Sequence, residues 1–503
     1  MSHNFPYIVL VLLPMVAAPL VYLVGRATLN RGQLWGMTFA RLFTIVVFLL
    51  EGVALYFSTM AAVAGESVSI QVGSEYMIFD GVGLLVSAVA VVLAFFVAIF
   101  STQYMEDEDG EEKFYALLLI CVGSIIGLAG SLDLFNLWVW FEVMAVSTYF
   151  LVAFYHDESA SLEAGVKYLV QSTIGSTLVL FGIALVFSQT GSVAMADIYR
   201  SLSNPLPLVG LGGLLMLVGF GVKAAFVPLH TWLPDAHSQA PSGISAMLSG
   251  IVIEAGLVAM LRMISILGHA NIPWGLILLV FGCLNIFLGN LMALRQTQVK
   301  RLLAYSSLAH VGYMLLGFGF SMTFMIMEGA QGAFFHMMTH AMMKGLAFLA
   351  AGALLYAFFL SQGKHSPLTL DDLNGASRKY PVTAFAFSVA VLALGGLPPM
   401  AGFMSKWQIL LSGAGTQNTV MIIIVVFAAL NSVLSLGYYA PMVNRIYRRE
   451  PSEAVQNGSP ITWQMALPMV LMVLIIVAVG VYPKTVEFLT SNAAYSLMAI
   501  FAG

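Results

Sequence analysis

The sequence predicts an all-α polytopic membrane protein, a single transmembrane domain over 1–503 with about 14 transmembrane helices. Two observations lead to this fold class. Of the 503 residues, 60% are hydrophobic and only 9% are charged, whereas globular domains carry about 25% charged residues. Apolar runs of about 20 residues, long enough to cross a bilayer as a helix, recur along the whole chain. No polar stretch is long enough to form a soluble domain.

The expected spans follow the apolar runs in chain order. They are 6–24, 36–60, 80–102, 114–131, 134–154, 164–188, 208–233, 241–266, 274–294, 300–320, 328–358, 380–412, 418–446 and 461–482. No Lys or Arg precedes the first run, so it lacks the basic region of a signal peptide and is expected to be a mature span. A weaker stretch near 485–501, interrupted by Glu487 and Asn492, is expected to be a fifteenth helix or an interfacial segment.

Charge and cysteine content exclude several classes of partner. The net charge of −4, without a basic tract, argues against nucleic acid. Cys121 and Cys283 both lie in apolar runs, so neither a disulfide framework nor a Cys-ligated metal centre is indicated. The sequence also has no dinucleotide-binding or phosphate-binding glycine motif, so we expect no cofactor and no metal ion.

Basic residues predict the orientation of the chain. Most of those between spans fall in loops that join an odd span to the next even one: Arg26, Arg31, Arg295, Lys300, Arg301, Lys364, Arg378, Lys379, Arg445, Arg448 and Arg449. The opposite loops contain little beyond Arg200. By the positive-inside rule the odd-to-even loops are cytoplasmic, and both termini face outward.

Ten ionisable residues inside the expected spans are candidates for a function in the membrane interior: Glu51, Glu142, Lys167, Lys223, His230, Glu254, His336, His340, Lys344 and Lys406. A charged side chain in hydrocarbon costs at least a few kcal/mol, so such residues are usually functional. Lys223 stands out because no charged residue occurs in the twenty positions before it. Without a cofactor, these groups can accept, store and pass protons or hold ions.

Two of the spans that contain lysines are expected to be broken, near spans 7 and 12. Pro228 and Pro234 follow Lys223, and "GGLPPMAGF" precedes Lys406. A proline removes a backbone hydrogen bond and clashes with the preceding turn. A pair of interrupted helices, one in each half of the chain, is typical of a transporter built from repeats. The 183 residues between the two lysines suggest a repeat of five helices, and an odd number implies inverted topology.

Three titratable residues follow a helical spacing between these breaks. His336, His340 and Lys344 lie at i, i+4 and i+8 in "HMMTHAMMKGLAF". They drift by only about 80° around a helix and form one stripe. The stripe is a candidate proton relay.

Five segments carry a resemblance to a known family. They are "FNLWVWFEVMAVSTYFLVAFY", "KAAFVPLHTWLPDAHSQAPSGISAMLSG", "VKRLLAYSSLAHVGYMLLGFG", "HMMTHAMMKGLAFLAAG" and "GGLPPMAGFMSKWQIL". Over about 70–450 the chain resembles the antiporter-like membrane subunits of respiratory complex I, membrane-bound hydrogenases and Mrp-type cation/proton antiporters. The resemblance implies two inverted five-helix repeats, at about 114–266 and 274–446. It also implies a multi-pass protein of the cytoplasmic (inner) membrane of a prokaryote, with other membrane subunits, protons or Na⁺, and lipid as its partners.

The resemblance also assigns roles to individual residues. It implies that Glu142 and Lys223 form the charge pair of the input half-channel, that His340 and Lys344 relay protons, and that Lys406 is the exit residue. At Glu254 the chain departs from the family, which commonly has a lysine there. An acid at this position is expected to attract a proton or cation, or to pair with Lys223 or a histidine.

Structural roles compete with these assignments. Lys223 would then reach a membrane interface, and Lys344 and Lys406 would anchor helices at the surface. Further structural alternatives are that Glu254 pairs with Arg262, that His336 only packs, that His230 and Asp235 fix the loop after the break, and that Glu163 and Lys167 cap a helix. Glu51 has no evident role.

Three functions fit this sequence. The first is a proton-translocating, non-redox subunit of a redox-driven respiratory complex of the complex I or hydrogenase type. The second is a subunit of a Mrp-type Na⁺/H⁺ antiporter. The third is a membrane partner of a soluble protein in bicarbonate uptake.

Overall fold

A computed structural model describes residues 5–29, 35–64, 68–72, 75–106, 108–202, 207–268, 270–362 and 367–502. Arg31 and Lys364, two of the residues that predict the orientation, lie outside the described residues. The described chain is a multi-pass helical membrane protein, with twelve helices long and apolar enough to cross a membrane and two shorter apolar helices. These fourteen correspond to the fourteen expected spans.

The long helices are α1 (Phe5–Leu29), α2 (Trp35–Val63), α3 (Gly81–Tyr104), α4 (Glu111–Gly130), α5 (Leu134–Val152), α6 (Ser159–Thr190), a continuous run of α10 (Ser242–Met247), η1 (Leu248–Val252) and α11 (Ile253–Ile266), α12 (Trp274–Leu294), α13 (Val299–Phe324), α14 (Met327–Gln362), α17 (Thr419–Arg448) and α19 (Trp463–Val481). The two shorter apolar helices are α8 (Pro207–Lys223) and α15 (Pro381–Gly395). The remaining elements are β1 (Val68–Val72), β2 (Glu75–Phe79), α7 (Met195–Ser201), α9 (Trp232–Gln239), η2 (Ala376–Arg378), α16 (Ala401–Gly415), α18 (Glu453–Asn457), η3 (Pro483–Val486) and α20 (Glu487–Ala502).

The helix breaks occur where the prolines predict them. The expected span 208–233 is α-helical only to Lys223, and α9 starts at Trp232. The expected span 380–412 divides into α15 and α16, and the turn between them contains Gly396 at a φ of 79°, which favours glycine. Both short apolar helices are therefore the first halves of broken spans.

Protein side chains satisfy the backbone groups that the first break frees. Asn285 of α12 accepts a hydrogen bond from Val227 N at 2.9 Å and donates one to Ala225 O at 3.2 Å. The Trp232 indole donates to Val222 O at 2.8 Å. Irregular backbone at membrane depth is tolerated only when it is buried in protein or lines a cavity, and here it is buried.

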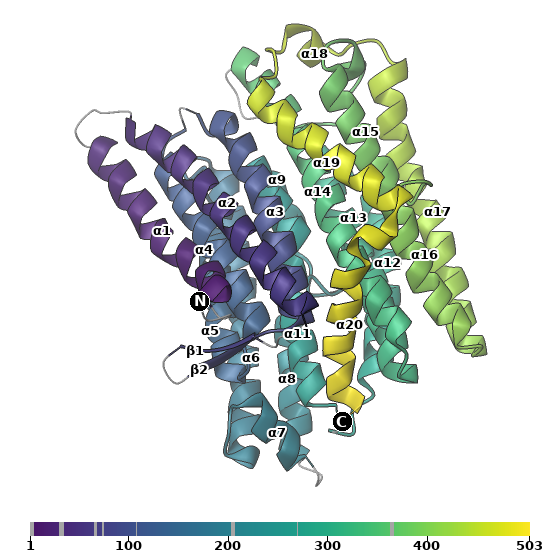
Figure 1. Cartoon of the computed structure of the whole chain (residues 1–503). Helices are drawn as coiled ribbons and strands as arrows, with labels where there is room; N and C mark the ends of the chain where they lie inside the picture. Colours follow the sequence, from purple (N-terminus) through teal and green to yellow (C-terminus); the bar gives the residue numbers. More distant parts are fainter. Residues whose placement is uncertain are drawn as a thin grey trace.

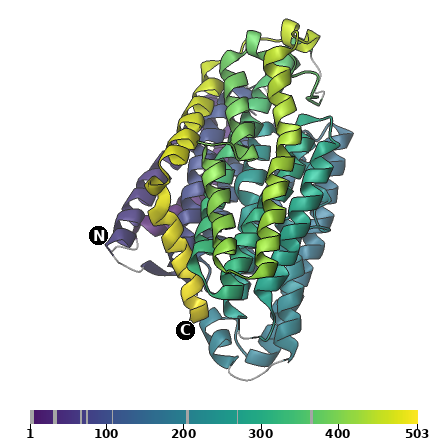
Figure 2. The ribbon, with the colours of Figure 1, turned by 90° about the vertical axis from the view of Figure 1, so that its right-hand side faces the viewer.

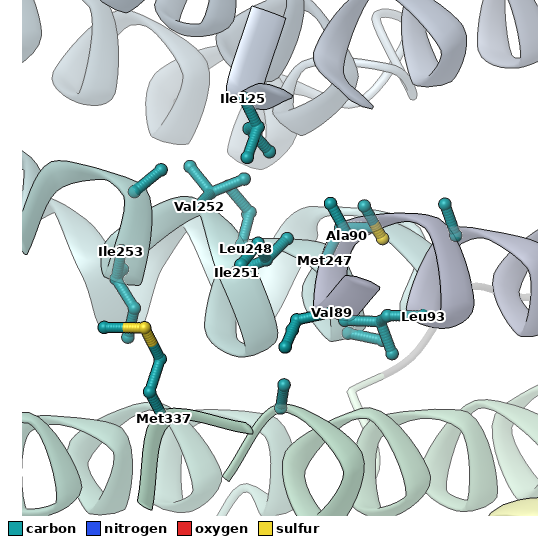
Figure 3. Close-up of a cluster of buried hydrophobic side chains, with 14 of the residues drawn as sticks. Val89, Ala90, Leu93, Ile125, Met247, Leu248, Ile251, Val252, Ile253 and Met337 are labelled. Atoms are coloured by element: carbon teal, nitrogen blue, oxygen red, sulfur yellow. The ribbon is translucent and has the colours of Figure 1, made fainter. Parts of the chain in front are cut away.

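The core lies where α3, α4, α14 and the run from α10 to α11 meet. Figure 3 shows Leu93 of α3, Ile125 of α4, Ile251 of η1 and Met337 of α14 within one apolar cluster. The most apolar part of the run Ser242–Ile266 is completely buried, whereas those of α2 and α17 are 33% and 22% buried. The outer helices α2 and α17 therefore present apolar side chains at the surface of the bundle, and the side chains of the central run are buried in protein.

The C-terminal helices cross the bundle. In Figures 1 and 2, α19 and α20 run along one side of it, and both pack against α3 and α14. The stretch expected near 485–501 is thus a helix held on the bundle, where the Ser496 hydroxyl accepts a hydrogen bond from Gly81 N at 3.0 Å. One feature was not predicted: β1 and β2 form an antiparallel hairpin between α2 and α3.

Candidate functional site: a buried line of ionisable side chains

Lys223 is the last residue of α8 and is only 1% exposed. The alternative in which its side chain reaches a membrane interface is therefore wrong. Its ammonium donates hydrogen bonds to the Tyr168 hydroxyl of α6 and to Thr148 Oγ1 of α5, the latter at 3.2 Å. The ring of Tyr168 stacks on Trp232 with centroids 4.1 Å apart, which ties this contact to the break. Gly256 of α11 lies against the lysine stem, since a Cβ atom there would lie 3.0 Å from Lys223 Cβ.

Glu142 does not form the expected close ion pair with Lys223. Within the described part of the chain, the two side chains are not joined by an ion pair of 4.0 Å or less, and Lys223 instead uses neutral hydroxyls. Thr148 lies six residues after Glu142, or about 120° around the helix, so the face of α5 that meets Lys223 is not the face of Glu142. Glu142 is half-buried, and its Oε1 has no hydrogen-bond partner among the residues that the structure describes.

Glu254 pairs with a histidine. Its Oε1 lies 2.7 Å from Nδ1 of His340, and neither side chain is exposed. The competing pair with Arg262 is absent, because the Arg262 guanidinium bonds both oxygens of Asp80, at 2.6 and 2.7 Å. Glu254 is the second residue after the π-helical segment η1, and such segments are frequent at functional sites. The pair connects α11, in the first half of the chain, to α14 in the second.

Two further histidine rings cluster with His340. His310 of α13 contacts His336 of α14, with His310 Nδ1 and His336 Nε2 3.0 Å apart. The His310 ring centroid is 5.0 Å from that of His340. His336 Nδ1 lies 2.8 Å from Ser405 Oγ of α16, so the cluster reaches the second broken span. His336 therefore makes polar contacts with His310 and Ser405, so it does more than pack.

Lys344 completes the stripe on α14 and is fully buried. Its ammonium donates to Leu303 O at 2.7 Å and to the Ser306 hydroxyl, both on α13. His336, His340 and Lys344 thus share one buried face, as their spacing predicts. The surface-anchor reading of Lys344 is wrong.

Lys406 of α16 is 4% exposed, so it is not a surface anchor either. Its ammonium donates to Leu394 O at 2.8 Å and to Ser432 Oγ at 3.2 Å, and it lies 4.8 Å from the centre of the Tyr313 ring. Leu394 O belongs to the last turn of α15, where carbonyl groups lack helical partners.

Lys223 and Lys406 occupy different positions relative to their breaks but share one electrostatic setting. Lys223 precedes its break as the last residue of α8, whereas Lys406 follows its break and bonds the end of α15. Both lysines therefore lie at the carboxyl end of a half-helix, where the helix dipole favours a positive charge.

Some predicted residues lie apart from this line. Lys167 of α6 pairs with Glu163 at 2.7 Å and with Asp235 of α9 at 3.1 Å, and Arg301 of α13 pairs with Asp235 at 2.6 Å. These ion pairs join the ends of the three helices. Partial burial raises the pKa of the Asp235 carboxyl, but hydrogen bonds from Lys167 and Arg301 outweigh this effect and hold the pKa below its usual range. His230 is nearly buried, and its ring centroid is 6.4 Å from that of Tyr305.

Sequence reasoning missed several members of the line. His310 lies in an expected span and inside a quoted segment, so the rule that selected the other ionisable residues also selects it. The hydroxyl groups of Tyr168, Thr148 and Ser306 had no comparable signal, because hydroxyls are common in apolar helices. Within the described residues, no group of three or more His, Cys, Asp or Glu is arranged to hold a metal ion.

Comparisons with known proteins agree with this geometry. A family described as NADH:quinone oxidoreductase/Mrp antiporter, transmembrane, matches residues 131–435. The chain is 33% identical to F(420)H(2) dehydrogenase subunit N of Methanosarcina mazei, covering 86% of this chain and 87% of that relative. It is 31% identical to NADH-quinone oxidoreductase subunit N of Desulfitobacterium hafniense, covering 93% and 94%.

Solved structures of membrane complexes contain similar chains. A chain of the membrane-bound sulfane sulfur reductase, an archaeal respiratory membrane complex, has 27% identity and a TM-score of 0.86, covering 99% of this chain and 98% of that one. A chain of respiratory complex I from Thermus thermophilus has 26% identity and a TM-score of 0.74, covering 95% and 100%. A chain of the Mrp complex from Dietzia shares the fold, with a TM-score of 0.87 at 22% identity over 100% and 99%.

Proposed function

The chain belongs to the NADH:quinone oxidoreductase/Mrp antiporter transmembrane family, and on this premise we propose that it is the proton-translocating membrane subunit of a redox-driven respiratory complex. Redox chemistry takes place in other subunits. This subunit moves H⁺ along the buried line from Lys223 through Glu254, the histidines and Lys344 to Lys406. The observation that carries the proposal is the buried Glu254–His340 hydrogen bond, which joins the two halves of the line.

The partners of the three lysines suit proton transfer. Lys223, Lys344 and Lys406 are each held by hydroxyl or carbonyl oxygens, which are neutral. Losing a hydrogen bond from a charged donor costs about 1.5–3 kcal/mol, whereas breaking a buried ion pair by removing one partner costs about 3–5 kcal/mol. Neutral acceptors therefore leave each lysine able to release its proton at lower cost than a carboxylate partner would.

The Glu254–His340 pair supplies the central step. A proton can reside on the carboxyl or on the imidazole, and its transfer between Oε1 and Nδ1 needs no movement of either helix. The remaining nitrogen of His340 is buried without a hydrogen-bond partner among the described residues. The His310 ring centroid lies 5.0 Å from that of His340 and 5.1 Å from that of His336, a spacing that allows transfer after small rotations or through one water. Ser405 then extends the path toward α16.

Further parts of the proposal concern the setting. The subunit spans the inner membrane of a prokaryote with both termini outward, it binds other membrane subunits of its complex, and lipid covers the exposed apolar faces of α2 and α17. These points rest on the basic loops and on the membrane complexes that contain the similar chains.

Na⁺ is the alternative passenger, since a hard cation prefers carboxylate oxygens and binds several of them. Glu254 is the single carboxylate at the centre of the line, and its Oε1 already faces an imidazole nitrogen. This donor set favours a proton over Na⁺ and the redox complex over the Mrp-type antiporter.

Transport by the complete complex tests the proposal. The complex is purified with its partner subunits, reconstituted into liposomes and supplied with its electron donor and acceptor, while internal pH and ²²Na⁺ uptake are followed. We expect a pH change that a protonophore abolishes and that does not depend on Na⁺ concentration. Electron-driven ²²Na⁺ uptake that persists with the protonophore would overturn it. Genes next to this one provide a second check, because iron–sulfur and quinone-site subunits are expected rather than small Mrp subunits or a soluble zinc protein.

A further inference from the structure

Glu51 lies midway along α2, outside both the buried line and the region that matches the family. Its side chain is 0% exposed. Both carboxylate oxygens are buried without a hydrogen-bond partner among the described residues. A fully buried acid without a partner is costly, so it requires a specific explanation.

Among the described residues, no counter-charge faces Glu51 from the helices that pack most closely against α2, which are α1, α3 and α4. The charged residues of these helices occupy end turns: Arg26 closes α1, and Glu111, Glu112 and Lys113 open α4. The other titratable residues on them are tyrosines and one thiol: Tyr7, Tyr22, Tyr104, Tyr115 and Cys121. Arg41, on α2 itself, is ten residues or about 15 Å from Glu51 along the axis and pairs with Glu111 at 2.5 Å.

An ionised Glu51 would therefore be an isolated charge in the membrane interior. Such a charge costs several kcal/mol even after the protein relaxes. The neutral acid avoids this cost, so burial favours the protonated form of Glu51. A protonated carboxyl is a hydrogen-bond donor and needs an acceptor.

Helix α1 has a backbone carbonyl without a helical partner within about 4.5 Å of the depth of Glu51 along the axis. Helices α1 and α2 run antiparallel. Gly36 of α2 packs directly on Thr28 of α1, since a Cβ atom added to Gly36 would overlap the Thr28 hydroxyl. Glu51 is fifteen residues along α2 from Gly36, and Leu13 is fifteen residues back along α1 from Thr28. Pro14 follows Leu13 and has no N–H. The carbonyl of Leu10, four positions before Pro14, therefore lacks its helical hydrogen-bond partner.

Glu51 also lies on a polar stripe. Thr44 and Ser58 precede and follow it by seven residues, and both hydroxyls are buried without a hydrogen-bond partner within the described residues. Positions seven apart drift by only about 20° around a helix, so the three side chains share one face. They are about 10.5 Å apart along the axis, a distance that water or hydronium must bridge.

We propose that Glu51 is a second proton-binding site in the membrane interior, separate from the line between Lys223 and Lys406, which exchanges its proton along the stripe Thr44–Glu51–Ser58. The ligand of the site is a proton, delivered as hydronium or through water. The site lies among α1, α2, α3 and α4, so it does not depend on the passenger or the driving force of the main line.

Infrared spectroscopy of the intact complex tests this proposal without a transport assay. We expect the wild type to show a C=O band of a protonated carboxyl that shifts in D₂O and is absent in Glu51→Gln. Thr44→Val should slow the shift at least several-fold. Thr59→Val is the matched control on the same helix, because the Thr59 hydroxyl already donates to Leu55 O at 2.8 Å, and it should leave the rate unchanged.

Either of two infrared results overturns the proposal: a band unchanged by Glu51→Gln, or a Glu51 band that never shifts in D₂O. If Glu51→Gln does not assemble, the wild type still provides a test. Dicyclohexylcarbodiimide enters from the lipid phase and modifies protonated carboxyls, and peptide mass mapping locates the label. A label on Glu51 supports the site, and an unlabelled Glu51 at full modification of the complex overturns it.

Discussion

Glu254 Oε1 and His340 Nδ1 are 2.7 Å apart across the interface of α11 and α14, and neither side chain is exposed. The resemblance implies a lysine at the position of Glu254, and a lysine ammonium could only donate to this histidine. A carboxyl group can both accept and donate, so this pair can hold one shared proton between its two members. On the proposed function, an acid at this position therefore keeps a group that can pass a proton to His340, with a charge of the opposite sign to that of a lysine.

The first prediction concerns this pair. Glu254→Gln keeps the size of the side chain and a hydrogen bond to His340, but an amide cannot take up or release a proton. We expect proton transport in reconstituted complex to fall by roughly 10²-fold or more, the usual scale for loss of a positioned acid or base. Glu254→Lys should restore part of it.

Glu163→Gln is the control for this substitution, because Glu163 is an exposed partner of Lys167 outside the line. It should pump as the wild type does. Full pumping by Glu254→Gln would instead leave Glu254 as a structural partner of His340.

The second prediction concerns the histidine cluster. His310→Ala removes the ring that contacts His336 and lies next to His340, so we expect a large loss of transport with normal assembly. His340→Ala should slow transport more than His336→Ala, because His340 bonds Glu254 directly. Pumping by each purified complex gives the measurement.

Serine substitutions on α16 provide a matched comparison for the cluster. Ser405→Ala removes the hydroxyl next to His336 and should slow transport. Ser412→Ala removes a buried hydroxyl that bonds Ile409 O of the same helix and should have no effect. Equal effects from both serines would mean that the cluster only packs.

Hydrophobic periodicity and proline positions predict most of the fold but only part of the site. They locate the spans, the breaks after Lys223 and before Lys406, and the shared face of His336, His340 and Lys344. They describe one helix at a time, so they cannot identify contacts between residues distant in sequence. Glu254 and His340 are 86 residues apart, and their contact depends on which faces of α11 and α14 meet.

The same limit applies to Lys223. The resemblance implies a charge pair of Glu142 and Lys223, but the rotation of α5 places the Thr148 hydroxyl, not the Glu142 carboxylate, within hydrogen-bond distance of the Lys223 ammonium. The β1–β2 hairpin was not predicted for another reason. In strands of five residues the alternation of apolar and polar side chains is too short to be distinguished from a loop.

The third prediction follows from the Lys223 contacts. Tyr168→Phe removes a hydroxyl that accepts a hydrogen bond from the ammonium and keeps the ring that stacks on Trp232. We expect transport to fall and the free energy of unfolding to fall by about 1–3 kcal/mol, since a buried charged donor loses an acceptor. Tyr199→Phe, on the peripheral helix α7, is the control. If Glu142→Gln stops pumping while Tyr168→Phe does not, Lys223 acts through a charge pair with Glu142 rather than through the Tyr168 hydroxyl.

The fourth prediction concerns pH and the clamp at Asp235. The pKa of this carboxyl is lowered in the folded protein, so its contribution to stability is present above its ordinary pKa of about 4 and is lost as pH falls through the folded pKa. Asp235→Asn should therefore lower the free energy of unfolding at pH 7 by about 1 kcal/mol, the scale for a partly exposed ion-pair cluster, which thermal denaturation measures. It should also weaken the loss of stability below pH 4. Asp197→Asn, in an exposed pair with Arg200, should change neither quantity.

The final prediction separates charge from proton release at Lys406. Lys406→Leu removes the cation and leaves Leu394 O without this donor, so both transport and stability should fall and the result alone would not identify the role. Lys406→Arg keeps a positive charge and donors for Leu394 O, but a guanidinium does not release its proton in proteins. If Lys406 must pass a proton onward, Lys406→Arg assembles with near-normal stability and fails to pump. If the residue only supplies charge at the end of α15, Lys406→Arg pumps. We expect the first result, with Lys484→Arg at an exposed site as the control that pumps normally.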